Sequence, residues 1–173
     1  MMQEAVDRGP HKSALAPDAI EQLTAEVGTK VAAGQAHIVN WLDVWDNPPH
    51  ELKISPISMI PHKSQKYRPI LDLSFSLHLH DSSCVPSVNE ASIKTSPKGS
   101  IDQIGHSLSH IIHAMALAAD DDKVFMAKWD IKDGFWKIDC AAGEEWNFAY
   151  VLPELGQPST KLVVPNTLQM GWI

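Results

Sequence analysis

The sequence has little of what marks a secreted or membrane-bound protein. Its only two cysteines, Cys84 and Cys140, show no CxxC spacing, which indicates reduced thiols and argues against a disulfide framework. No apolar run approaches the roughly 20 residues that a membrane-spanning helix needs. The stretch from Met1 to Glu4 is polar and acidic, unlike the start of a signal peptide. We therefore expect an intracellular protein without a membrane partner, in either the cytoplasm or the nucleus.

An overall excess of positive charge is also missing. The formal net charge of −7 argues against a general nucleic-acid binder, because such proteins are usually basic. The charge is uneven, however, since residues 53–98 carry six lysines and arginines against three acids. Apolar residues make up 44% of the 173 residues and charged residues 20%, which is typical of a globular chain with a buried core. This length suits one domain or part of a larger one.

The first 50 residues show no visible chemistry. Residues 1–16 are polar with scattered Ala, Pro and Gly, and we expect them to form a disordered lead. Pro17 is well placed to begin a helix. The apolar residues that share one face of this helix are Ile20, Leu23 and Val27. A second helix is expected over residues 35–45, so residues 17–50 are interpreted as a helical N-terminal segment that packs outside the functional region.

A basic hairpin is expected next. Residues 54–61 are extended but interrupted by proline, which favours an edge strand, and residues 67–74 read as the returning strand. The basic residues at or near the tip are Lys63, Lys66 and Arg68. Basic residues at the tip of a hairpin suit a loop that closes over a triphosphate. The alternative for this segment alone is a solvated basic turn.

The centre of the sequence is the stretch that follows an expected buried strand at residues 124–129. Asp130 stands at the end of this strand, where a carboxylate is half exposed and rigidly aimed. Asp133, Gly134 and Phe135 follow it. A pair of carboxylates suits a hard cation held beside a phosphate, while Gly134 lets a ligand approach the backbone closely. Phe135 offers a flat wall to a ring or a sugar.

Three segments resemble one protein family. Residues 130–135 (DIKDGF) resemble the first catalytic aspartate motif of reverse transcriptases, with the best likeness to those of retrotransposons. Residues 66–74 are similar to the fingers segment of that family, and residues 161–172 to the apolar strand and turn that follow later in its palm. The resemblance implies an α+β fold, an antiparallel sheet with packed helices. Residues 51–173 would then be a partial reverse transcriptase domain, the fingers and an incomplete palm.

The resemblance also implies a catalytic role for one residue. The parent reaction is nucleotidyl transfer by an RNA-directed DNA polymerase, in which two Mg²⁺ ions activate the primer hydroxyl and stabilise the leaving pyrophosphate. Asp130 would be the catalytic carboxylate that bridges both ions, and the backbone carbonyl of Ile131 would bind one of them. The implied partners are a deoxynucleoside triphosphate (dNTP) and an RNA or DNA template-primer.

The same resemblance assigns nucleotide contacts. Backbone amides near Asp133 and Gly134 would hold the triphosphate, and Phe135 would pack against the sugar and exclude ribonucleotides. Met170 and Gly171 would line the base and the sugar. The cationic side chains that would contact the phosphates are Lys63, Lys66 and Arg68.

One family motif is missing from the sequence. The later Tyr/Phe-x-Asp-Asp hairpin, which supplies a further metal-binding carboxylate, does not occur anywhere in the chain. We therefore expect a truncated fragment that is inactive alone, since a lone carboxylate binds Mg²⁺ weakly. An incomplete sheet would also leave an edge uncovered and favour self-association. The residues expected near that surface are Val163, Val164, Leu168, Met170 and Trp172.

Two other interpretations stay open: a nucleotide-binding or nucleic-acid-binding module without catalysis, and an unrelated α+β interaction domain.

Residues 100–118 predict an amphipathic helix. Its expected buried stripe comprises Ile104, Leu108, Ile111, Ile112 and Met115. The opposite face carries His106, His110 and His113, whose spacing could ligate zinc, but no cysteine or carboxylate within the helix completes a ligand set.

Overall fold

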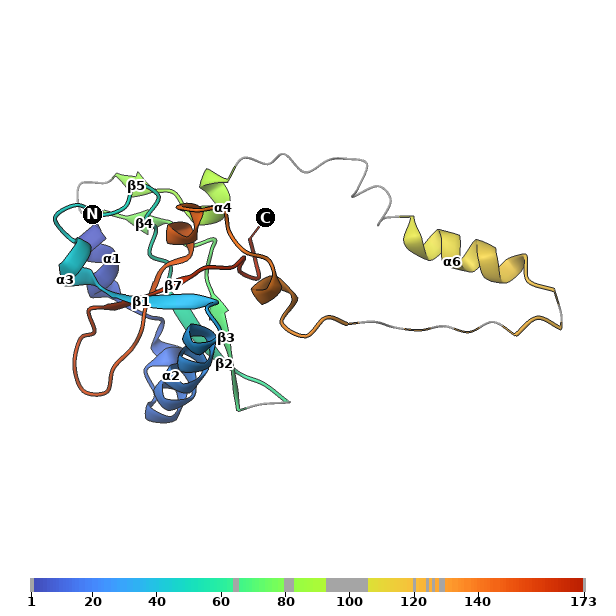
Figure 1. The fold of residues 1–173 in the computed structure, drawn as a ribbon, viewed down its shortest axis with the longest axis horizontal. Coiled ribbons are helices and arrows are strands. Elements are labelled where there is room, and N and C mark those ends of the chain that lie inside the picture. Colours follow the sequence, from blue (N-terminus) through green and yellow to red (C-terminus); the bar gives the residue numbers. More distant parts are fainter. Residues whose placement is uncertain are drawn as a thin grey trace. The chain divides into compact units, whose positions relative to one another are not determined.

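The chain has an α+β fold with antiparallel sheets, seen in a computed structural model that describes residues 2–63, 66–79, 83–92, 106–119, 121–123, 125, 127 and 130–172 (Figure 1). It divides into two compact units. The larger unit comprises residues 1–92 and 133–173, and the smaller unit comprises residues 93–132. Among the described residues, no helix is both long enough and apolar enough to cross a membrane.

The main sheet of the larger unit has three antiparallel strands in the order β1-β7-β6. They are β1 (Ala36–Asn40), β6 (Tyr150–Val151) and β7 (Lys161–Pro165). Val163 pairs with Ile38 of β1 on one side and with Tyr150 of β6 on the other. The side chains of Val163 and Val164 are 0% exposed. The expectation that these two valines lie near an uncovered edge is therefore wrong, because β1 supplies a partner strand from the N-terminal region.

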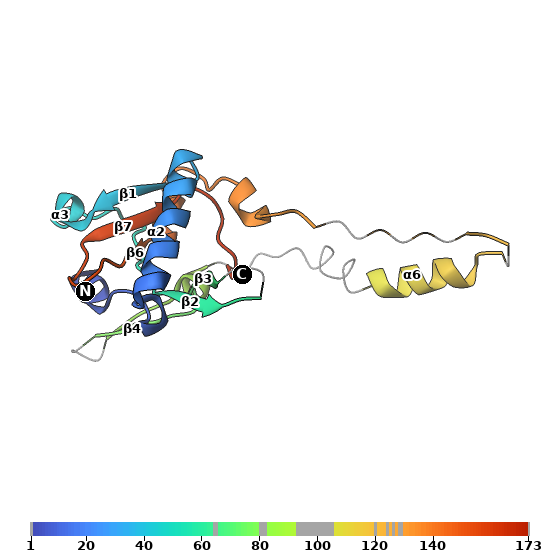
Figure 2. The ribbon, with the colours of Figure 1, turned by 90° about the horizontal axis from the view of Figure 1, so that it is seen from below.

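The expected basic hairpin is confirmed. Strands β2 (Ile57–Pro61) and β3 (Tyr67–Leu71) pair antiparallel, with Ile60 opposite Arg68. Helix α2 (Pro17–Ala32), which the sequence also predicts, packs against β1 and β3 (Figure 2). Its buried residues are Ala19, Ile20, Leu23 and Val27. Ala19, Leu23 and Val27 join a core that includes Met59, Leu71 and Val163, so α2 links the hairpin to the main sheet.

Two expectations about the N-terminal region are wrong. Residues 2–16 are not a disordered lead, since they form helix α1 (Met2–Arg8) and the short 3₁₀ helix η1 (Lys12–Ala14). Ala5 and Val6 are buried in a second core cluster with Leu162 and Val164. A single helix over residues 35–45 is also wrong: β1 is followed by the short helix α3 (Trp41–Val44), where Asn40 accepts a hydrogen bond from the Leu42 amide. Pairing with β7 overrides the helical pattern there.

The remaining elements of the larger unit are short. A small hairpin joins β4 (Leu77–His78) to β5 (Cys84–Val85), and α4 (Val88–Ala91) follows it. The 3₁₀ helices η2 (Gly134–Lys137) and η3 (Glu144–Phe148) precede β6. Of the apolar run at residues 146–153, only Tyr150 and Val151 form a strand. The positive φ of 93° at Gly143, just before η3, is a conformation that glycine adopts without strain.

A capping box fixes the start of α4 and gives a stability prediction. The Ser87 hydroxyl accepts a hydrogen bond from the Glu90 amide, and the Glu90 carboxylate accepts one from the Ser87 amide. Ser87→Ala is expected to lower the free energy of unfolding by about 1 kcal/mol, because it leaves a helix amide without its acceptor. Urea denaturation measures this change. Ser87→Thr keeps the hydroxyl and should stay closer to the unchanged chain; equal losses in both variants would contradict a capping role.

The smaller unit contains helix α6 (Ser107–Ala116). The apolar stripe of this helix was expected to be buried, but it is exposed, because no described element of this unit covers it. Its described members are Leu108, Ile111, Ile112 and Met115. Ile104 lies outside the described residues. The buried strand expected at residues 124–129 falls partly outside them as well, and Phe125, which is described, is 87% exposed and belongs to no strand.

Candidate nucleotide-binding site

Helix α2 holds the basic hairpin in place through side chains spaced four residues apart. Asp18 Oδ2 lies 2.6 Å from Lys66 Nζ and accepts a hydrogen bond of 3.1 Å from the Tyr67 hydroxyl. The hydrogen bond between Lys66 and Asp18 lowers the pKa of the Asp18 carboxyl and raises the pKa of the Lys66 ammonium. The Gln22 side chain makes two hydrogen bonds with the backbone of Tyr67. It donates to the Tyr67 carbonyl at 2.7 Å and accepts from the Tyr67 amide at 3.1 Å. Four polar contacts therefore fix the base of β3 to α2.

Arg68 brings two of the expected nucleotide-binding segments together. Its guanidinium Nη2 lies 3.1 Å from the sulfur of Met170, although the two residues are 102 positions apart. Arg68 is exposed, and one sulfur contact leaves most of its five N–H donors available to an anion. Lys63 is exposed as well. The described part of the hairpin thus presents Lys63, Lys66 and Arg68 at one end of the β2–β3 pair, and Arg68 touches the Met170 segment.

The Met170–Gly171 turn is anchored to the C-terminal end of the β4–α4 region. The Gly171 carbonyl accepts a hydrogen bond of 3.0 Å from the Asn89 side chain, and the Trp172 indole donates one of 2.8 Å to the Ser92 hydroxyl. Gly171 has a φ of 98°, which glycine adopts without strain. The Gln169 side chain donates hydrogen bonds to the carbonyls of Thr167 and Leu168.

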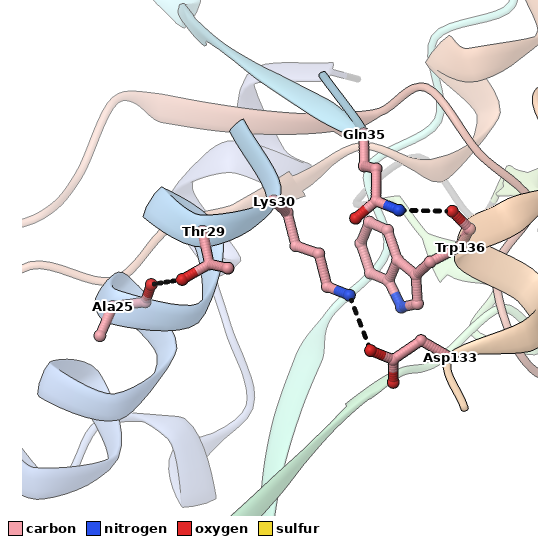
Figure 3. Close-up of polar contacts among 6 residues, drawn as sticks. All are labelled: Ala25, Thr29, Lys30, Gln35, Asp133 and Trp136. Carbon is pink, nitrogen blue, oxygen red and sulfur yellow. Dashed lines mark hydrogen bonds and ion pairs between the residues drawn. The ribbon is translucent and has the colours of Figure 1, made fainter. Parts of the chain in front are cut away.

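Helix α2 also holds the segment that begins at Asp133. Lys30 Nζ lies 3.4 Å from Asp133 Oδ2 and 4.5 Å from the centroid of the Trp136 ring (Figure 3). Gln35 donates a hydrogen bond of 2.6 Å to the Trp136 carbonyl (Figure 3). Asp133 adopts a φ of 55°, a left-handed conformation that is uncommon for a residue with a side chain. Gly134 and Phe135 follow it in η2, where the Phe135 side chain is 43% exposed.

Residues from five other parts of the chain line one pocket with α2. The α2 pocket, about 70 Å³ in volume, lies between helix α2, strands β2, β3 and β6, and the residues Trp136, Gln169 and Met170. Most ligand pockets are several times larger, so a whole nucleotide does not fit inside it. The cationic side chains of the hairpin are exposed and do not line this pocket.

The expected catalytic residue lies in the smaller unit. Asp130 and Ile131 are both exposed there. Across the described ranges, no three His, Cys, Asp or Glu side chains gather into a group that could hold a metal ion. His106 and His110 stack with ring centroids 6.4 Å apart, without such a group around them. These described donors do not fit a two-ion centre, so the roles of Asp130 and Ile131 toward Mg²⁺ stay predictions.

The contributions of α2 were missed at the sequence level. Asp18, Gln22, Glu26 and Lys30 follow one another at intervals of four residues, a spacing that places side chains on one face of a helix. A polar stripe of this kind beside an apolar face signals contacts with other polar segments. It does not say which segments those are, because the partners lie about 45 and 103 positions further along the chain.

No known protein family matches the chain, and none of the curated proteins matches it significantly.

Proposed function

We propose that this chain forms the fingers and the first part of the palm of an RNA-directed DNA polymerase of the retrotransposon type, and that it binds the triphosphate of a dNTP. The observation that carries this proposal is the 3.1 Å contact between Arg68 and Met170. Arg68 belongs to the fingers-like segment and Met170 to the palm-like segment. The resemblance assigns both residues to the same nucleotide, so contact between them supports a shared binding surface.

The proposed roles follow from the chemistry of each side chain. Arg68 can bind two phosphate oxygens with its planar fork of donors, while Lys63 and Lys66 add point charges. Asp133, Gly134 and Phe135 would contact the triphosphate and the sugar from the other side. In this proposal Lys66 exchanges its exposed contact with Asp18 for a phosphate. Such an exchange costs little, because an exposed ion pair stabilises a protein by less than about 1 kcal/mol.

This exchange predicts that Asp18→Asn strengthens dNTP binding. The variant releases Lys66 from its ion pair, and the dissociation constant is expected to fall about two- to fourfold, in line with the weak energy of an exposed pair. Fluorescence titration with dTTP measures the change. Asp43→Asn removes the same charge from an exposed position outside the hairpin and should leave the affinity near its original value. Equal gains in both variants would instead indicate a general charge effect and argue against a role for Lys66.

The chain by itself is proposed to bind a nucleotide without transferring it. The sequence lacks the Tyr/Phe-x-Asp-Asp motif, so Asp130 is the only carboxylate that the resemblance assigns to catalysis. We expect no primer extension on RNA or DNA templates with Mg²⁺ or Mn²⁺. Template-dependent incorporation that disappears in Asp130→Ala would contradict this expectation and would make the chain a complete catalyst.

A further inference from the structure

The α2 pocket contains polar groups that the described residues leave unused. Tyr150 is only 4% exposed and lines this pocket, yet its hydroxyl makes no hydrogen bond within the described part of the chain. The Glu26 carboxylate lines the same pocket and is likewise without a hydrogen-bond partner among the described residues. Glu26 is half-buried, so the pocket is lined by a hydroxyl and a carboxylate whose oxygens can accept hydrogen bonds from a ligand that supplies donors.

The charges around the pocket favour a cation. Glu26 and Lys30 line the pocket, and Asp133, which does not line it, pairs with Lys30 beside it. Together these three groups carry a net charge of −1 when all are ionised. Burial raises the pKa of the Glu26 carboxyl, the charge of Lys30 opposes this, and Asp133 adds to it. Burial and the charge of Glu26 also raise the pKa of the Tyr150 hydroxyl, which stays protonated. One added positive charge would balance the cluster.

The shape and lining of the pocket favour a small planar group. The pocket holds about 70 Å³, which suits a head group and excludes a larger molecule. Trp136, which has a flat indole ring, and Pro69 are among the residues that line it. Gln169 is 6% exposed and uses its amide nitrogen on two carbonyls, so its amide oxygen is not used by those bonds.

We propose that the α2 pocket binds a guanidinium group. A guanidinium carries five N–H donors in a plane, matches a carboxylate such as Glu26 through two parallel hydrogen bonds, and stacks on aromatic rings. Its remaining donors reach the Tyr150 hydroxyl oxygen and the Gln169 amide oxygen. An ammonium offers only three donors and no flat face. The pocket shares Met170 with the proposed nucleotide-binding surface, but the guanidinium contacts use neither Arg68 nor the hairpin lysines.

Titration of the full chain with methylguanidinium, followed by two-dimensional NMR of ¹⁵N-labelled protein, tests this proposal. We expect saturable shifts in the signals of residues that line the pocket, and weaker binding of methylammonium. Glu26→Gln is expected to weaken methylguanidinium binding about tenfold or more, because it removes a charged acceptor, and Tyr150→Phe by about three- to tenfold. The folding of Glu26→Gln is not at risk, since a carboxyl whose pKa is raised in the folded state destabilises that state at neutral pH.

Glu21→Gln is the matched control, because it removes the same charge from an exposed position on α2 that does not line this pocket. Unchanged affinity in Glu26→Gln, equal affinity for methylammonium, or no saturable shift would each overturn the proposal. The source of the guanidinium is resolved by a second titration with a capped Ala-Arg-Ala peptide. Binding of the peptide identifies an arginine side chain as an occupant, whereas binding of methylguanidinium alone identifies a free guanidino compound. Glu26→Gln and Tyr150→Phe are not expected to lose dNTP binding. A failure of the guanidinium proposal can therefore be told apart from a failure of the proposed nucleotide binding.

Discussion

The Arg68→Ala variant is expected to bind dTTP about tenfold to a hundredfold more weakly than the unchanged chain. A hydrogen bond to a charged group is worth roughly 1.5–3 kcal/mol, and Arg68 is the side chain of the hairpin that can bind phosphate with two parallel bonds. It is exposed and touches Met170 only through a sulfur, so the variant loses little else. Fluorescence titration at low and at high salt measures the loss.

The control for this prediction is Lys12→Ala, which removes the same charge from an exposed residue of η1 outside the hairpin. It should change the dTTP affinity little, and that small change should disappear at high salt because long-range charge effects are screened within roughly 10 Å. If Arg68→Ala and Lys12→Ala bound dTTP equally well, the hairpin would not be the phosphate site. The solvated basic turn would then be the correct interpretation of residues 62–68.

Leu162→Ala is expected to lower the free energy of unfolding of the larger unit by about 3 kcal/mol. Leu162 is 0% exposed in the central strand β7 and packs in the cluster that includes Val6, Trp41 and Val164. Truncating a buried leucine loses its transfer free energy and leaves a cavity, which together cost roughly 2–5 kcal/mol. Urea denaturation followed by tryptophan fluorescence measures this quantity.

Leu155→Ala is the same chemical change at a side chain that is 62% exposed, and it should cost less than about 0.5 kcal/mol. The contrast between the two variants tests the position of β7 at the centre of the sheet. Similar small losses in both would contradict it, and would restore the expectation that the residues around Val163 lie at an uncovered edge.

The elements that could be predicted from the sequence are those with strong local signals. Pro17 and the apolar face of Ile20, Leu23 and Val27 predict α2, and the structure confirms it. The β2–β3 hairpin was predictable because two extended runs flank a short polar turn. In each case the local pattern and the tertiary packing agree, so local rules are sufficient.

The failures arise where a distant partner decides the structure. Residues 36–40 carry an apolar pattern that suits a helix, but pairing with residues 161–165 makes them a strand. Residues 2–16 are polar enough to suggest disorder, yet Ala5 and Val6 find a place in the core beside Leu162. The partner strand β7 and the residues that pack around it lie 120 or more positions later in the chain. The local sequence of residues 2–16 or 36–40 therefore carries no sign of them.

In the candidate site, too, features with a local signal could be predicted and contacts between distant segments could not. The basic residues of the hairpin were predictable, because a cluster of lysine and arginine beside a turn is visible in the sequence. The contacts of Lys30 with Asp133 and Trp136, and of Asp18 with Lys66, could not be predicted, since they depend on how α2 packs. The polar spacing of four residues along α2 indicates a functional face only once its neighbours are known.

The most direct test of the central claim is a titration of the unchanged chain with dTTP and, separately, with thymidine at two salt concentrations. Triphosphate recognition by Lys63, Lys66 and Arg68 predicts saturable binding of dTTP that weakens as salt rises, and no saturable binding of thymidine. Binding of thymidine as tight as that of dTTP, or no binding of either, would contradict the claim that this chain holds a nucleotide through its basic hairpin.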